Sequence, residues 1–504
     1  MNIITLDIGT QSTKASVYDD SGAMLFEASK EYSAEFIPPG KVEQDPDDWR
    51  NAAIYTLSKV AAFAHAHDIA LSGISITSQR ASVIPVTADG RPLHNAIMWQ
   101  DKRTLAECAE IEEKVSAEEV YQITGLRLGP YAVAPRMRWI KNHQPEIYHQ
   151  AAKLIGVQDY VNYCLTGTFK TDWSQAARTM LMNIRTFEWD ARLLAATGVT
   201  VNKLCELVPP GTITGNLTLE MQKLTGLPAL CVIVAGGDQQ VGALAGNVVK
   251  PGQAQAVTGT GTFIIAYTDQ PSFDPDRRVI VSASADAGKW IIEASIFNSG
   301  QILRWAKQEF AREIAGYDEA YAILMSEAKN SPIGANGLII PPHFEGSAAP
   351  YWEPKAKGLV FNLSIGTKRA DILRAIVEGI ACEIADNVEL LSVVGTPITQ
   401  LTAAGGMANS EFFTQMQADA ANVPVLRFSD KEASSKGAAM SGFVALGQFT
   451  DLQAAARSML DSVPQHNYPI VKNHETYSTI RLRKHKLVKA LQENRVYDEF
   501  MTAL

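Results

Sequence analysis

The chain has 504 residues, of which 46% are hydrophobic and 20% are charged. This is ample apolar material for a packed core, and at about 150 residues per domain the length suggests two or three domains. The 45 basic and 54 acidic side chains give a net charge of −9, which argues against a general nucleic-acid binder. No signal-peptide pattern, membrane-spanning apolar run or paired cysteine spacing is found. We therefore expect a cytoplasmic protein with reduced thiols that binds neither nucleic acid nor membrane.

The first half is predicted to be mixed α/β. The apolar residues 3–6, the turn 9–13, the alternating residues 14–18 and the segment 23–29 predict a β-meander. Asp45-Pro46 begins a long helical pattern, because Asp is a favoured N-cap and Pro is tolerated in the first turn. The following pattern predicts a buried strand over 71–77 and helices over 104–116, 134–143 and 145–153.

A second cycle of the same kind starts near residue 230. The apolar run 230–235 is typical of a central strand, and it ends at Gly236-Gly237-Asp238 before a helical stretch over 239–246. Strand, Gly/Thr turn and strand then recur over 253–267, which indicates an internal duplication. The turn Lys250-Pro251-Gly252 marks the boundary, so the predicted domains are 1–247 and 248–504. The rest predicts helices over 368–394 and 410–421, strands over 401–404 and 423–428, and a charged, peripheral helix over 473–504.

Two aspartates each end an apolar strand next to glycine, Asp7 and Asp238. Ligands of α/β proteins bind at such strand ends. Two carboxylates that converge in one cleft could hold Mg²⁺ and deprotonate a hydroxyl. The alternative is that each aspartate only caps the next element of the chain, and for Asp238 that alternative stays open.

Three glycine-rich turns could hold a nucleotide. The turns 9–13 and 259–262 offer backbone N–H groups and hydroxyls that suit phosphate oxygens, and Lys14 could add a positive charge. One such turn alone is more often a simple hairpin, but their equivalent places in the two halves favour phosphate binding. A third site, 403–409, could let a flat ring lie against the backbone. The P-loop and dinucleotide-binding fingerprints are both missing from the sequence.

Taken in chain order, these motifs resemble those of the FGGY carbohydrate kinases. The resemblance spans most of the chain and implies an α/β fold of two ribonuclease-H-like domains, of the actin and hexokinase type, around a central cleft. It further implies phosphorylation of a sugar or polyol by ATP with Mg²⁺, and a homodimer as one expected assembly. The motifs that carry it are Asp7-x-Gly9-Thr10…Lys14, Gln79-Arg80, Trp99-Gln100-Asp101-x-Arg103, Gly237-Asp238-Gln239-Gln240, Gly259-Thr260-Gly261 and Gly405-Gly406-Met407-x-Asn409.

The resemblance also implies a role for individual residues. Asp238 would be the catalytic base, and Asp7 and Asp238 would hold Mg²⁺, partly through water. The substrate site would contain Gln79, Arg80, Trp99, Tyr131, Asp238, Gln239 and Phe263. The ATP site would contain Thr10, Gln11, Lys14, Gly259, Thr260, Gly300, Arg304, Gly405, Gly406 and Asn409.

The expected substrate is a small polyol or ketose. The site motifs are most similar to those of glycerol kinases, but Ala81 stands where those enzymes have a glutamate, and Thr77-Ser78-Gln79 differs from the Gln-Met-His of xylulokinases. Glycerol, xylulose and autoinducer-2 are alternative substrates. A catalytically inactive sugar-binding regulator on the same fold is an alternative function, and an actin- or chaperone-like ATPase is another. Both are less favoured, because the aspartates, the Gly/Thr turns and a small polar pocket beside Asp238 are all present.

Overall fold

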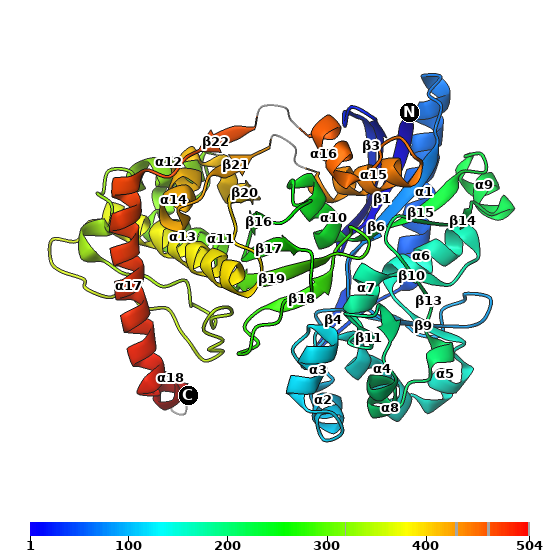
Figure 1. Cartoon of the computed structure of the whole chain (residues 1–504), viewed down its shortest axis with the longest axis horizontal. Coiled ribbons are helices and arrows are strands. Elements are labelled where there is room, and N and C mark those ends of the chain that lie inside the picture. Colours follow the sequence, from blue (N-terminus) through cyan, green and yellow to red (C-terminus); the bar gives the residue numbers. More distant parts are fainter. Residues whose placement is uncertain (318, 429–431, 461–463, 502–504) are drawn as a thin grey trace.

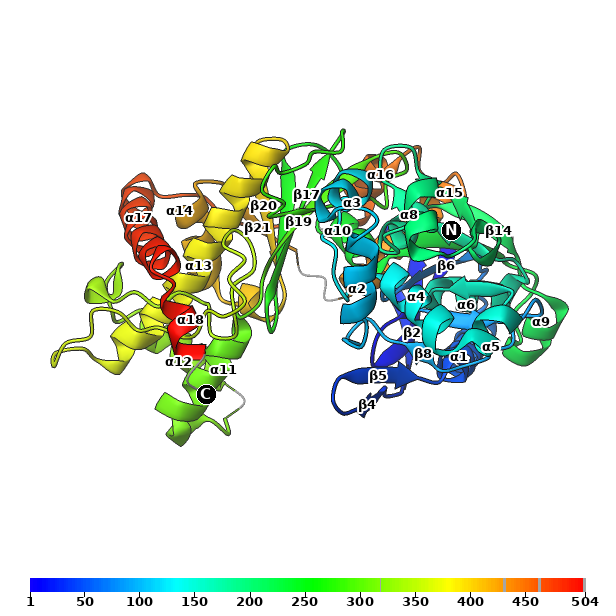
Figure 2. The ribbon, with the colours of Figure 1, turned by 90° about the horizontal axis from the view of Figure 1, so that it is seen from below.

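A computed structural model describes residues 1–317, 319–428, 432–460 and 464–501 of the chain. Two large β-sheets form the centres of two lobes, which Figures 1 and 2 show side by side. None of the helices in the described ranges combines the length and the apolar character needed to cross a bilayer.

The first sheet has the strand order β14-β15-β6-β1-β2-β3. The predicted meander is confirmed, because β1, β2 and β3 pair antiparallel in sequence order. β6 pairs parallel with β1 and with β15, so the carboxyl ends of these three strands lie at one edge. The strands are β1 (Asn2–Ile8), β2 (Ser12–Asp19), β3 (Met24–Glu31), β6 (Gly73–Ser78), β14 (Thr212–Asn216) and β15 (Cys231–Gly237).

The second sheet repeats this arrangement, with the order β18-β19-β17-β16-β20-β21-β22. Its meander of β16, β17 and β19 is followed by the parallel strands β20 and β21, as β6 and β15 follow the first meander. The predicted internal duplication is therefore confirmed. The strands are β16 (Gln253–Thr258), β17 (Thr262–Thr268), β18 (Ile280–Ala283), β19 (Trp290–Ile296), β20 (Gln400–Ala404), β21 (Val425–Arg427) and β22 (Gln465–Asn467).

Helices cover both sheets. The first helix begins where the sequence predicts, with the Asp45 side chain accepting the N–H of Asp47 and with Pro46 in the first turn. The helices of the first half are α1 (Pro46–Ala66), α2 (Leu105–Glu112), α3 (Ala117–Thr124), α4 (Val133–His143), α5 (Pro145–Gln150), α6 (Val157–Thr166), α7 (Trp173–Ala177), α8 (Ala191–Thr197), α9 (Leu219–Thr225) and α10 (Asp238–Ala245). Those of the second half are α11 (Gly300–Phe310), α12 (Ala320–Ala328), α13 (Arg369–Val394), α14 (Glu411–Ala421), α15 (Ala433–Ala445), α16 (Leu452–Met459), α17 (Val471–Glu493) and α18 (Val496–Met501).

Short strands complete the first lobe and correct one prediction. The predicted helix over 145–153 ends at Gln150, because Lys153–Ile155 forms strand β9 and pairs with β7. The buried side chains of Leu154 and Ile155 favour the strand there. The short strands are β4 (Glu35–Ile37), β5 (Lys41–Gln44), β7 (Ile84–Val86), β8 (Ala96–Ile97), β9 (Lys153–Ile155), β10 (Lys170–Asp172), β11 (Met182–Asn183), β12 (Glu188–Trp189) and β13 (Glu206–Val208).

The chain returns from the second lobe to the first near its end. In Figure 1 the orange helices α15 and α16 lie beside the blue strands of the first sheet. The buried hydroxyl of Ser75 in β6 donates a hydrogen bond to the carbonyl oxygen of Ala438 in α15 at 2.6 Å. The first lobe thus contains residues from both sides of the predicted domain boundary.

The C-terminal helix lies on the outside of the second lobe, as predicted, but three of its side chains are buried. Tyr477, Lys484 and Val488 of α17 are buried, and the helix crosses the second lobe beside α13 and α14 (Figure 1). Part of the predicted helical segment, residues 502–504, lies outside the described residues.

Candidate active site

Asp238 lies at the end of β15, as predicted, and is the first residue of α10. The interpretation of Asp238 as the cap of this helix is wrong, because Gly237 holds the N-cap position. The Asp238 Oδ1 atom accepts the N–H of Gln239 at 2.7 Å and lies 3.6 Å from the Arg80 Nε atom. Burial raises the pKa of Asp238, although the positive charge of Arg80 opposes the shift. The residue therefore combines properties of a proton acceptor with a fixed orientation.

Arg80 joins Asp238 to the second lobe. Its Nη1 atom lies 3.3 Å from Glu293 Oε1 on β19, and Arg178 Nη1 lies 4.0 Å from the same oxygen. Burial acts to raise the pKa of Glu293, but the two guanidinium groups hold it below its ordinary value. Burial lowers the pKa of Arg178 to about 10. Arg178 and Glu293 were not predicted from the sequence, although a charged residue within the apolar strand Trp290–Ile296 is a visible signal.

Asp7 lies close enough to Asp238 for the two carboxylates to repel each other. Burial and the charge of Asp238 raise the pKa of Asp7 to about 7, while Lys14, its partner across β1 and β2, opposes the shift. The Lys14 ammonium also forms an ion pair with Glu432 at 2.7 Å. Among the described residues there is no group of three or more metal-ligating side chains. The two carboxylates fit Mg²⁺, which is commonly held by one or two carboxylates together with substrate phosphates and water.

The first Gly/Thr turn meets the predicted substrate residues. Gln79 accepts a hydrogen bond from the Thr10 hydroxyl at 3.3 Å and donates one to the carbonyl oxygen of Gly9 at 3.3 Å. The indole N–H of Trp99 donates to the Thr10 hydroxyl at 3.4 Å. Thr10, which is predicted to bind ATP, therefore contacts two of the residues that are predicted to bind the substrate. Gln11, by contrast, is exposed at the hairpin tip beyond β1.

Three predicted substrate residues are aromatic and exposed. Trp99 is 40% exposed, Tyr131 is 56% exposed and Phe263 is 48% exposed. Other aromatic side chains of the chain, such as Phe36 and Tyr468, are at least as exposed, so exposure alone does not distinguish a ligand contact. The role of these three residues stays a prediction.

Two cavities contain most of the predicted nucleotide residues. One of about 620 Å³ is lined by Gly259, Thr260, Gly300, Arg304, Gly406 and Asn409, among others. The other, of about 590 Å³, reaches from Gly405, Gly406 and Asn409 to Asp238 and Gln239. Because Gly406 and Asn409 belong to both walls, the cavities adjoin at the third glycine site. Their combined extent suits a nucleotide whose phosphates point toward Asp238.

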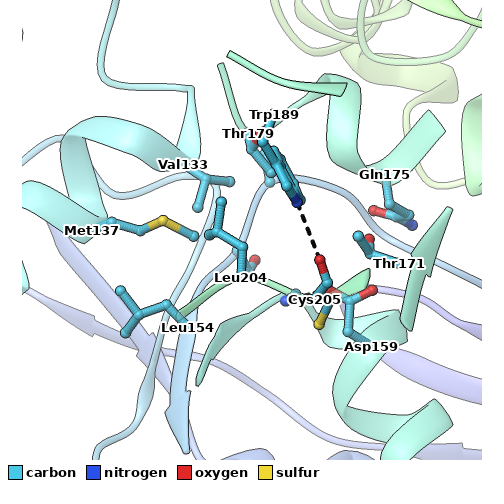
Figure 3. Close-up of a pocket in the computed structure, with 13 residues that line it drawn as sticks. Val133, Met137, Leu154, Asp159, Thr171, Gln175, Thr179, Trp189, Leu204 and Cys205 are labelled. Atoms are coloured by element: carbon cyan, nitrogen blue, oxygen red, sulfur yellow. Dashed lines mark hydrogen bonds between the residues drawn. The ribbon is translucent and has the colours of Figure 1, made fainter. Parts of the chain in front are cut away.

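A third, much smaller cavity is found in the first lobe, and its wall includes Ala81, the residue after Arg80. Its volume is about 30 Å³, and Asp159, Gln175 and Cys205 also line it (Figure 3). The indole N–H of Trp189 donates to the carbonyl oxygen of Cys205 at 3.2 Å within this wall. Burial raises the pKa of Asp159 to about 7. The cavity has room for about one water molecule, so it is not the sugar site.

Comparison with known proteins places the chain in a family. The N-terminal domain model of the FGGY family of carbohydrate kinases matches residues 2–245, and the C-terminal domain model matches residues 254–446. The chain therefore belongs to this family, and its predicted class as a carbohydrate kinase, a phosphotransferase, is confirmed.

Individual relatives match over nearly the full length. The gluconokinase of Bacillus subtilis (strain 168) is 30% identical over 486 residues, covering 95% of this chain and 94% of its own. The glycerol kinase of Koribacter versatilis (strain Ellin345) is 30% identical over 466 residues, covering 90% and 92%. The crystal structure of a ligand-bound xylulose kinase from Lactobacillus acidophilus is 26% identical, with a TM-score of 0.90 and 99% of each chain covered. The predicted fold of two actin/hexokinase-type domains is thereby confirmed.

Proposed function

We propose that the protein transfers the γ-phosphoryl group of ATP to a hydroxyl of a small sugar, polyol or sugar acid, with Asp238 as the catalytic base. The position of Asp238 carries the proposal. Its carboxylate lines the cavity that extends to the glycine site at 405–409, and its contacts with Gln239 and Arg80 both use Oδ1. Oδ2 can therefore accept a proton from a bound hydroxyl.

The proposed step needs only one proton transfer within the protein. The substrate hydroxyl gives its proton to Asp238, its oxygen bonds to the γ-phosphorus, and the bond between that phosphorus and the β-phosphate oxygen breaks to release ADP. Phosphoryl transfer depends mainly on positioning and on stabilisation of charge. Arg80 supplies the positioning, because it holds both Asp238 and Glu293.

The glycine turns supply the phosphate and nucleotide contacts in this proposal. Thr10, Lys14, Gly259 and Thr260 would hold the β- and γ-phosphates. Gly300, Arg304, Gly405, Gly406 and Asn409 would hold the nucleoside, since all five line one or both of the adjoining cavities. Asp7 and Asp238 would hold Mg²⁺, which supplies neutralisation of the phosphate charge.

The proposed substrate class is wider than the polyol or ketose expected from the sequence. The relatives described above are named for gluconate, glycerol and xylulose, so an aldonate joins the polyols and ketoses as a candidate. A homodimer and a cytoplasmic location stay predictions.

The test measures ADP release from Mg-ATP in the presence of polyols, ketoses, aldoses and aldonates, each added singly. We expect one compound to stimulate turnover, and Asp238→Asn to reduce kcat by roughly a thousandfold or more, because the base is lost. The matched control is Asp68→Asn, the same change at an exposed aspartate with a left-handed backbone that asparagine also adopts. It should turn over like the wild type.

Two results would contradict the proposal. Full activity of Asp238→Asn would show that Asp238 is not the catalytic base. A compound that raises the melting temperature without stimulating ADP release would favour the sugar-binding regulator.

A further inference from the structure

A five-residue helix, α7, touches the strand ends that carry the site residues. It follows β10 directly and is capped by Asp172, whose Oδ1 accepts the N–H of Ser174 at 2.8 Å and the N–H of Gln175 at 3.3 Å. None of its residues was predicted to belong to the site. Figure 3 shows Gln175, which α7 contributes to the wall of the small cavity of the first lobe.

Ser174 links α7 to the residue before Asp238. The Ser174 hydroxyl donates to Asp172 Oδ1 at 2.5 Å and accepts the N–H of Gly237 at 2.8 Å. A serine hydroxyl has one proton to donate. Because that proton is hydrogen-bonded to the Asp172 carboxylate, a lone pair of the serine oxygen is turned toward the N–H of Gly237. Asp172 is itself fixed, because its Oδ2 accepts from Gln158 Nε2 at 2.5 Å. Asp172, Ser174 and Gln158 are all buried.

The backbone before Asp238 needs such a support. The pairing of β15 with β6 shifts register between Val234 and Gly236, and Gly236 has a φ of 128°, where side chains are rarely tolerated. Two consecutive glycines can adopt many conformations, and the Ser174 hydroxyl gives the buried N–H of Gly237 a fixed acceptor. The hydrogen bond therefore selects the conformation that leads into Asp238.

The same helix also supports the neighbouring strand end. Gln175 Nε2 donates to the carbonyl oxygen of Ser78 at 3.2 Å and to its hydroxyl at 3.1 Å. Ser78 is followed directly by the predicted substrate residues Gln79 and Arg80. Because α7 holds β6 and β15 together at their ends, it fixes Arg80 relative to Asp238.

We infer that Ser174, oriented by Asp172, is a positioning residue for Asp238. The inference rests on the proposed function of Asp238 as the base. Ser174 touches neither reacting group; it acts through the N–H of Gly237. Its loss should affect the chemical step more than the binding of ATP, because the nucleotide cavities are lined mostly by the second lobe.

The experiment compares Ser174→Ala with Ser331→Ala in the full-length protein. Ser331 is also a buried serine whose hydroxyl donates to an aspartate, Asp371 Oδ1 at 2.6 Å, but it belongs to the second lobe and lines neither of the two nucleotide cavities. We expect Ser174→Ala to lower kcat by about a hundredfold, the cost of a small misplacement at a reacting centre, with the KM for ATP nearly unchanged. Ser331→Ala should keep the wild-type kcat. Ser174→Thr, which retains the hydroxyl, should recover most of the rate.

Hydrogen exchange gives a second readout that needs no turnover. The amides of residues 236–240 should exchange faster in Ser174→Ala than in the wild type or in Ser331→Ala. If the wild type shows no kinase activity, the proposed function fails while this measurement still tests the support itself. Unchanged exchange at 236–240, or an unchanged kcat in Ser174→Ala, would overturn the inference. A fall in melting temperature without a selective loss of kcat would assign Ser174 a purely structural role and also overturn it.

Discussion

Lys484 shows how a single residue can hold an element in place. Its side chain on α17 is 2% exposed and forms ion pairs with Glu383 and Asp386 on α13. Arg481, one turn earlier, pairs with Asp386 at 2.6 Å, and His343 Nε2 lies 3.0 Å from Glu383 Oε1. Both carboxylates are buried, so they depend on these cations for compensation. From the sequence, this segment is predicted only as a charged, peripheral helix, and the buried ion pairs are not.

Replacing Lys484 should therefore destabilise the second lobe. Lys484→Met leaves two buried carboxylates with one fewer cation, which costs about 3–5 kcal/mol when a buried pair is broken. The measurement is thermal or urea unfolding. Lys489→Met is the matched control on the same helix, because Lys489 is 73% exposed and its ion pair with Glu493, at 3.5 Å, lies at the surface. An equal melting temperature for Lys484→Met and Lys489→Met would refute the assignment.

The same pairs predict a pH dependence. Burial acts to raise the pKa values of Asp386 and Glu383. The neighbouring cations outweigh this effect and hold both pKa values below their ordinary values. A carboxylate with a depressed pKa stabilises the folded state above its unfolded pKa of about 4, and this stabilisation is lost as the pH falls further. The wild-type melting temperature should therefore drop below about pH 4. The difference between wild type and Lys484→Met should shrink over the same range, because protonation neutralises the unpaired carboxylates.

At the scale of elements, the turn after β20 contains two consecutive glycines, Gly405 and Gly406, that serve different structural roles. Gly405 has a φ of 84°, and a Cβ on it would lie 2.5 Å from the carbonyl oxygen of Thr258 on β16. A Cβ on Gly406 would meet no atom within 4 Å, and this residue lines both nucleotide cavities. The first glycine thus permits close approach of two backbones, while the second leaves room for a ligand.

Alanine substitutions should separate these two roles. Gly405→Ala forces strain of roughly 1–3 kcal/mol into the turn and should lower the melting temperature. Gly406→Ala should leave the melting temperature unchanged but raise the KM for ATP about tenfold, a loss of about 1.4 kcal/mol. Each variant serves as the control for the other. Normal ATP kinetics in Gly406→Ala would show that the nucleotide does not approach this backbone.

At the scale of the whole molecule, α15 returns to the first lobe and packs against the helix that begins with Asp238. A Cβ on Gly437 of α15 would lie 1.8 Å from the carbonyl oxygen of Val241 in α10. The two helices therefore approach more closely than any side chain would allow. In this way the second half of the chain helps to place a residue of the first half.

A methyl group at this contact should be felt at the active site. Gly437→Ala would normally favour a helix by up to about 1 kcal/mol, but here it must push α10 away. We expect a lower melting temperature and a lower kcat, measured with the substrate that the ADP-release panel identifies. Gly316→Ala is the control, because a Cβ there meets no atom within 4 Å. A stabilised, fully active Gly437→Ala would show that the two helices separate without consequence.

The sequence by itself determined the repeated strand patterns, the start of α1, and the strand ends that carry Asp7, Asp238 and the glycine turns. These features are local, since they depend on hydrophobic periodicity, capping residues and turn chemistry. The tertiary structure decided which distant groups meet: Arg80 with Glu293, Ser174 with Gly237, Lys484 with Glu383 and Asp386, and α15 with the first sheet. Such contacts join residues far apart in the chain, and they are stable only where burial removes the competition of water. No local pattern encodes that burial.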